Sequence, residues 1–136
     1  MPYPFLARLA LLGLAVFLAG CGPKGRERVT GKVTFKGAPL DQGSIAFIPQ
    51  DPSGGATQEG AMIKNGKYEV PARQGLLPGT YKVAISSPEP VGSAEAIPGE
   101  SGPPAQDRIP PEFGPNGNQT VEVKKGSKNV FNFDVP

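Results

Sequence analysis

Glycine and proline together make up about a quarter of this chain, and their density is the strongest constraint on its fold. The sequence has 136 residues, of which 19 are Gly and 17 are Pro. Both residues are unfavourable inside a helix, Pro by about 3 kcal/mol relative to Ala. A helical bundle is therefore excluded, and we expect short extended segments separated by turns.

Alternation of apolar and polar residues marks these extended segments. Between residues 29 and 35, Val29, Val33 and Phe35 fall in one phase while Thr and Lys fill the other, which is typical of a strand with one buried face. The same reasoning predicts strands at residues 44–48, 61–64, 68–70, 80–86, 120–123 and 129–135. About seven short strands in roughly a hundred residues predict an all-β fold, a single antiparallel β-sandwich over residues 28–136.

Turn residues stand between the predicted strands. Asn65-Gly66 separates two β-prone segments and is a strong hairpin signal, because a type I′ turn needs positive φ at both central positions. The segment from Lys36 to Pro39 also has turn chemistry. These signals support the division of the chain into short neighbouring strands.

The predicted core consists of the large side chains in the inward phases of these strands. They are Val29, Val33, Phe35, Ile45, Phe47, Ile63, Tyr68, Val70, Tyr81, Val83, Ile85, Val121, Val123, Phe131, Phe133 and Val135. At roughly 2 kcal/mol of burial each, they suffice for one small core and not for two domains.

The first 20 residues have the pattern of a secretory signal peptide. Arg8 precedes an apolar run at residues 9–18, and the small residues Ala19 and Gly20 follow. The apolar stretch falls short of the ~20 residues that span a bilayer. We therefore expect residues 1–20 to be removed and the mature chain to begin at Cys21.

Leu18, Ala19, Gly20 and Cys21 resemble the lipobox of bacterial lipoproteins. In that family the Cys thiol is joined to diacylglycerol, and the new amino group receives a further acyl chain such as palmitate. The resemblance implies that Cys21 is the lipidation site and that the protein is anchored in the cell envelope. The absence of Asp after the Cys favours the outer membrane. The alternative is an ordinary secreted protein with a chance Cys near the cleavage site.

Two segments lack the strand pattern. Residues 21–27 have no apolar periodicity and are predicted to be a lipidated tether. Residues 87–117 hold eight Pro and five Gly among 31 residues, which predicts a long loop between two strands. Ile109 and Phe113 are candidates for docking the end of this loop onto the domain. Phe113 is the mature aromatic residue outside the predicted strands, and we regard it as a possible contact residue for a partner.

Taken together, several motifs resemble the carboxypeptidase regulatory-like, transthyretin-like domain. They are Val29 to Phe35, Gly37 to Leu40, Gly43 to Pro49, Asn65 to Tyr68, Gly75 to Tyr81 and Asn129 to Val135. The likeness is to the short lipoprotein form that is abundant among planctomycete-type bacteria. It implies a transthyretin-like sandwich. The peptidases that named this domain carry a separate zinc-binding catalytic domain, for which this chain has no room.

The composition disfavours an enzyme. The chain has no His, no Trp and one Cys, which excludes His-based acid/base catalysis, His-containing zinc sites and internal disulfides. Hydroxyisourate hydrolases share the fold that the resemblance implies, but they use His residues and a distinctive C-terminal tetrapeptide that this chain lacks. The acidic residues are scattered, and Asp41, Asp51 and Asp107 are interpreted as turn residues. We expect no enzymatic activity, no cofactor and no metal.

Lys32 and Asn132 present one covalent alternative. Some related surface sandwiches join a Lys of the first strand to an Asn of the last strand through an isopeptide bond. Here Lys32 is out of phase with Val33, and Asn132 is out of phase with Phe131. Both side chains are therefore predicted to face solvent, which disfavours the bond.

The sequence thus predicts a non-catalytic, lipid-anchored cell-envelope protein that presents a small β-sandwich for structural or protein-interaction roles. Its expected partners are the membrane, through the N-terminal lipid, and an envelope protein that the sequence does not identify. The formal charge of +2 is too balanced to indicate nucleic-acid binding. The alternative function is a ligand- or glycan-binding lipoprotein that serves a membrane complex, which would have a defined pocket.

Overall fold

The structure, a computed structural model, describes residues 25–89 and 105–136. The predicted signal peptide, the lipobox residues Leu18, Ala19 and Gly20, and the predicted lipidation site Cys21 lie outside the described residues. Across residues 25–89 and 105–136 the regular structure is β-strand with three short 3-10 helices, so the all-β prediction is confirmed. No helix in this part of the chain is long and apolar enough to cross a membrane.

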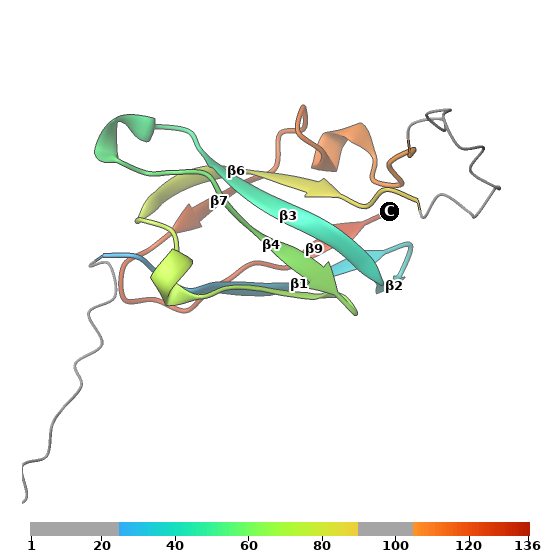
Figure 1. The fold of residues 1–136 in the computed structure, drawn as a ribbon, viewed down its shortest axis with the longest axis horizontal. Coiled ribbons are helices and arrows are strands. Elements are labelled where there is room, and N and C mark those ends of the chain that lie inside the picture. Colours follow the sequence, from blue (N-terminus) through green and yellow to red (C-terminus); the bar gives the residue numbers. More distant parts are fainter. Residues whose placement is uncertain (1–24, 90–104) are drawn as a thin grey trace, which may run out of the picture.

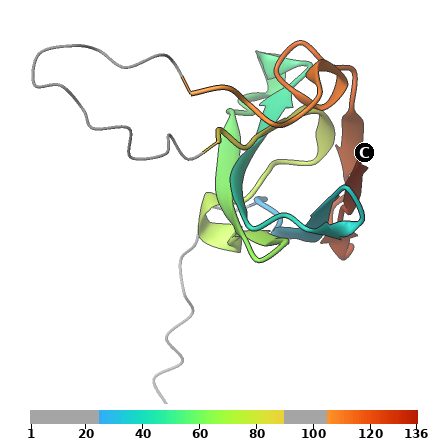
Figure 2. The same cartoon turned by 90° about the vertical axis from the view of Figure 1, so that its right-hand side faces the viewer.

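The strands form one sheet that curls around the core (Figures 1 and 2). They are β1 (Val29–Phe35), β2 (Ala38–Pro39), β3 (Gln42–Pro49), β4 (Glu59–Lys64), β5 (Lys67–Val70), β6 (Gly79–Ser86), β7 (Thr120–Val123), β8 (Asn129–Val130) and β9 (Phe133–Val135). The order across the sheet is β2-β1-β5-β4-β3-β6-β7, with β8 and β9 paired to β1. The 3-10 helices are η1 (Pro52–Gly54), η2 (Ala72–Gln74) and η3 (Pro111–Phe113).

The described strands outnumber the predicted ones for two local reasons. The turn after β1 continues into the short strand β2, which was not predicted. Residues 129–135, predicted as one strand, are divided into β8 and β9 at Phe131 and Asn132. Pairing with β1 is interrupted there because the side-chain oxygen of Asn132, instead of a backbone carbonyl, accepts the Lys32 N–H at 2.9 Å.

The prediction of a wholly antiparallel arrangement is wrong for the last two strands. The pairs from β2 through β7 are antiparallel, whereas β8 and β9 run parallel to β1. Alternation places side chains on a face but does not reveal the direction of the partner strand. After β7 the chain turns and reaches β1 instead of forming a hairpin back onto β7.

Asn129 holds this crossover turn in place. Its side chain is 5% exposed, and its Oδ1 accepts the Lys124 N–H at 2.9 Å. Its Nδ2 donates to the carbonyls of Lys124 at 3.0 Å and Ser127 at 3.2 Å. A buried amide that satisfies three backbone groups fixes the turn at low cost in desolvation.

The hairpin turn at Asn65-Gly66 has the geometry that the sequence predicts, and the turn at Lys36-Gly37 has the same geometry. Asn65 and Gly66 have φ values of 50° and 73°, and Lys36 and Gly37 have φ values of 51° and 80°. Positive φ at both central residues is the signature of the type I′ turn. The turns place β5 beside β4 and β2 beside β1.

The core agrees with the prediction at most positions. Of the predicted core residues, Phe35, Val121 and Phe131 are only partly buried, although they pack against the core, and the others are buried. Leu40 and Leu76 are buried from turns and were not predicted. The predicted docking of Ile109 is confirmed, since this residue joins the core cluster.

Candidate functional site

The chain enters the domain earlier than the predicted end of the tether. Glu27 and Leu76 exchange backbone hydrogen bonds of 2.7 and 3.0 Å. Arg26 donates to the carbonyl of Gly75 at 2.9 Å and pairs with Glu59 at 3.2 Å. Arg26 and Glu27 therefore belong to the folded domain.

The described ends of the 87–117 segment are held by a polar cluster, here called the loop-base cluster, formed by Asp41, Ser86, Ser87, Asp107 and Arg108. Asp107 Oδ1 accepts the backbone N–H groups of Ser87 at 2.9 Å and Ile109 at 3.0 Å, and Oδ2 accepts the Ser86 hydroxyl. Partial burial raises the pKa of Asp107, but these hydrogen bonds and the nearby Arg108 outweigh it and lower that pKa below 3.8. Asp107, interpreted from sequence as a turn residue, thus joins the start of the segment to residues 107–109.

Arg108 is the second centre of the loop-base cluster. Its Nη2 donates to Asp41 Oδ1 at 2.7 Å and to Ser87 Oγ at 2.6 Å. The guanidinium also lies 5.8 Å from the centre of the Phe35 ring, at the end of β1. The hydrogen bond from Arg108 lowers the pKa of Asp41.

In the loop-base cluster, the Ser87 hydroxyl helps to hold the backbone in place. The buried Ser87 donates a hydrogen bond from its hydroxyl to the carbonyl of Gln42 at 2.6 Å, so this hydroxyl is not directed at a general base.

Phe113, the predicted contact residue, lies in η3 and is partly buried against the core. Its role toward a partner stays a prediction.

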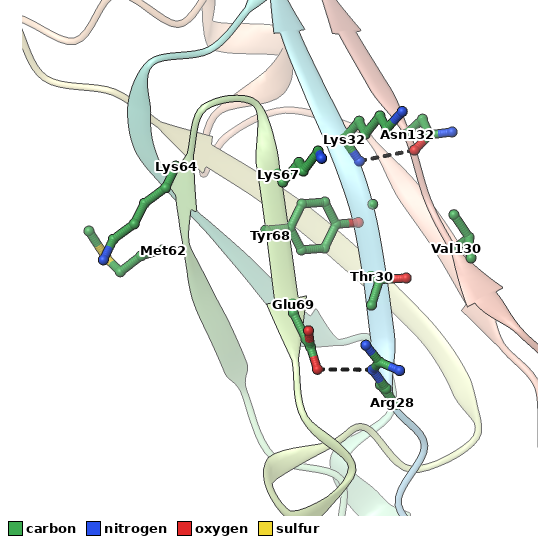
Figure 3. Close-up of a pocket in the computed structure, with 11 residues that line it drawn as sticks. Arg28, Thr30, Lys32, Met62, Lys64, Lys67, Tyr68, Glu69, Val130 and Asn132 are labelled. Carbon is green, nitrogen blue, oxygen red and sulfur yellow. Dashed lines mark hydrogen bonds and ion pairs between the residues drawn. The ribbon is translucent and has the colours of Figure 1, made fainter.

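A second polar surface lies on the outer side of β1, β5 and β4, and we call it the basic face (Figure 3). Lys32 on β1 is directly opposite Lys67 on β5, and Lys67 is directly opposite Lys64 on β4. All three side chains are exposed. Three adjacent strands therefore carry lysines side by side in one row.

The surroundings of the row form an open groove of about 1000 Å³. Arg28 and Glu69, joined by a 2.9 Å ion pair, lie at one end of the basic face. Met62 and Val130 flank it and are 65% and 52% exposed. They are the exposed large hydrophobic residues of the part of the chain that the structure describes.

Within the described part of the chain, the lysines of the row form no ion pair with an acidic residue. In residues 25–89 and 105–136 the ion pairs are Arg26–Glu59, Arg28–Glu69 and Arg108–Asp41, and the three lysines take part in none of them. Like charges directly opposite on neighbouring strands destabilise a sheet. We therefore expect the row to reduce stability and its positive charge to attract an anionic partner.

The sequence predicted the exposure of Lys32 but not the row of three lysines. The prediction that Lys32 and Asn132 face solvent is confirmed. Alternation does not reveal that β5 lies between β4 and β1, which is what brings Lys67 and Lys64 beside Lys32. The missing information was the strand order.

Metal binding finds no support in the described geometry. Across residues 25–89 and 105–136, no group of three His, Cys, Asp or Glu side chains could hold an ion. The carboxylates with lowered pKa values, Asp41, Asp51 and Asp107, are each held by hydrogen bonds from protein groups. We therefore interpret these three carboxylates as structural residues.

Comparison with known proteins does not indicate a function for this chain. No protein-family model, no curated protein and no solved structure matches the chain. The likeness to carboxypeptidase regulatory-like lipoproteins therefore rests on the sequence motifs.

Proposed function

We propose that this protein is a non-catalytic, lipid-anchored protein of the cell envelope that presents its β-domain as a binding module. The absence of Asp after Cys21 favours the outer membrane. The observation that carries the binding role is the row of Lys32, Lys67 and Lys64. These like-charged residues lie directly opposite one another, which is expected to reduce the stability of the sheet, and they form no ion pair in the described part of the chain. Such an arrangement is typical of a surface that binds an external partner.

The anchor rests on the resemblance of residues 18–21 to a lipobox. Arg26, where the folded domain begins, is five positions after Cys21. An extended chain covers at most about 3.5 Å per residue, so the domain would lie within roughly 18 Å of the lipid. A lipid on Cys21 would thus keep the domain close to the membrane surface.

The anchor and the 87–117 segment are associated with opposite ends of β1. The chain enters beside the start of β1, where Glu27 pairs with Leu76. The loop-base cluster lies near the other end of β1, where Arg108 contacts Phe35. A seven-residue strand covers about 20 Å, so the base of the 87–117 segment is distant from the point of entry. We propose that this segment and Phe113 contact an envelope protein.

We also assign the domain to the transthyretin-like sandwiches that its motifs resemble. The curl of the sheet around one core supports this assignment, because strands far apart in the sheet order come to face one another (Figure 2). The contact between Phe47 of β3 and Tyr68 of β5, with ring centres 6.0 Å apart, lies within that core.

In-cell crosslinking followed by affinity capture and mass spectrometry tests the proposal, with Cys21→Ser as the unanchored control. We expect a discrete set of envelope partners that is lost in the control. Partners that are unchanged in Cys21→Ser, or that are cytoplasmic, would overturn the anchored role. A diffuse set of envelope neighbours together with saturable binding of a small molecule or glycan would favour the ligand-binding alternative.

A further inference from the structure

The basic face combines three features that suit one kind of surface. It carries a row of lysines that form no ion pair among the residues the structure describes, it has an exposed apolar side chain on either side, and it adjoins the point where the chain enters the domain. We infer that the basic face docks on the anionic head groups of the bilayer that holds the lipid anchor. This inference rests on the proposed anchoring at Cys21.

Charge complementarity is the first argument. Neighbouring strands are about 4.8 Å apart, so Lys32, Lys67 and Lys64 spread their charges over roughly 10 Å of a single sheet face. Lysines close to an anionic membrane each increase binding about fivefold. An open array of this kind, spread across three strands, suits a plane of head groups better than an enclosed small ligand.

The apolar flanks are the second argument. Met62 on β4 and Val130 on β8 stand at the borders of the lysine row and are largely exposed (Figure 3). Interfacial binding combines buried apolar area with attraction to anionic lipids. Docking would cover both side chains at the boundary between head groups and acyl chains.

Continuity with the tether is the third argument. Arg28, which lines the same groove, is two residues from Arg26, where the chain reaches the domain. A lipid on Cys21 would therefore hold this end of the basic face near the membrane. Tethering raises the effective concentration of the bilayer at the face, so that a modest attraction is sufficient for docking.

Met62 provides a direct reporter of docking. The chain has two methionines, and the other one is Met1, in the predicted signal peptide. The experiment uses the full acylated protein in vesicles of phosphatidylcholine alone or with about one third phosphatidylglycerol. The oxidation rate of Met62 by hydrogen peroxide is followed by mass spectrometry. We expect Met62 to oxidise at least about threefold more slowly on the anionic vesicles, and about 0.5 M salt to remove the difference.

Two matched variants identify the charges responsible. The triple variant Lys32→Gln, Lys64→Gln and Lys67→Gln should lose the protection of Met62. The triple variant Lys124→Gln, Lys125→Gln and Lys128→Gln removes the same charge from the crossover turn and should keep it. All six lysines are exposed, so neither variant removes a buried contact.

The outcomes separate docking from anchoring. Equal oxidation rates on both kinds of vesicle, with the protein still bound to them, would overturn docking and leave the anchor intact. A protein that carries no lipid and binds neither kind of vesicle would overturn the anchor itself. Protection of Met62 by a soluble acidic polymer, without protection on anionic vesicles, would overturn the membrane as the partner.

Discussion

The Tyr68 hydroxyl donates a 2.6 Å hydrogen bond to the backbone carbonyl of Phe131, across the position of Gly31 on β1. The bond joins β5 to the C-terminal segment at the interruption between β8 and β9. It also gives a partner to a hydroxyl that is buried in the core. Burial raises the pKa of Tyr68, so the hydroxyl remains a donor over the physiological range.

Tyr68→Phe should destabilise the domain by about 1 to 2 kcal/mol, because the Phe131 carbonyl loses its side-chain donor while the ring packing is kept. Urea denaturation of the purified protein measures the change. Val130→Ala, at an exposed site in β8, is the control and should stay within about 0.5 kcal/mol of the parent. An unchanged midpoint in Tyr68→Phe would mean that this bond does not contribute to stability.

Gly31→Ala should be more damaging. A Cβ at this position would lie 1.8 Å from the Phe131 carbonyl oxygen and 2.6 Å from the Tyr68 hydroxyl, so the C-terminal segment would have to move away from β1. We expect a loss of at least about 2 kcal/mol. Gly54→Ala is the matched control, since nothing lies within 4 Å of its added Cβ. Equal stability of the two variants in thermal denaturation would contradict the close approach.

Asp107→Asn should lower stability at neutral pH and weaken the loss of stability in acid. The folded-state pKa of Asp107 is below the ordinary value of 3.8, so its carboxylate stabilises the fold above that pH. This contribution disappears as the pH falls through the folded-state pKa. Denaturation midpoints between about pH 2 and pH 7 measure the effect. Glu122→Gln, an exposed site with the same charge change, is the control, and identical pH profiles for both variants would refute the role of Asp107.

Lys67→Glu should stabilise the domain, because it converts two opposed like-charge pairs, with Lys32 and with Lys64, into opposite-charge pairs. The expected gain is about 0.5 to 1 kcal/mol at low salt, and it should shrink at about 0.5 M salt. Thermal denaturation at both salt concentrations tests this. Lys125→Glu changes the charge equally outside the row. A gain of the same size in Lys125→Glu would show that overall charge, and not the row, is responsible.

Much of the fold was predictable because alternation and turn chemistry are local. The inward phase of β1 and the turn at Asn65-Gly66 follow from residues that are neighbours in sequence. The parallel pairing of β8 and β9 with β1 was not predictable, because it depends on how far the sheet curls after β7. The buried positions of Leu40 and Leu76 were missed for a related reason, since turn residues have no periodicity to reveal burial.

The candidate sites were less predictable than the fold. No lysine of the basic face stands out in the sequence. The three become neighbours because β5 lies between β1 and β4 in the sheet. The loop-base cluster likewise joins Asp41 to Arg108, which are 67 residues apart in sequence. The role of Cys21, by contrast, is predicted from a short motif of residues that are neighbours in sequence.

The most direct test of the account is the mass of the N-terminal peptide of the protein purified from membranes. We expect a peptide that begins at Cys21 and carries a diacylglyceryl group on sulfur and an acyl chain on the amino group. The same preparation from Cys21→Ser should contain no such peptide, and that protein should leave the membrane fraction. A membrane-bound protein with a free Cys21 thiol, or a mature chain that begins elsewhere, would contradict the account.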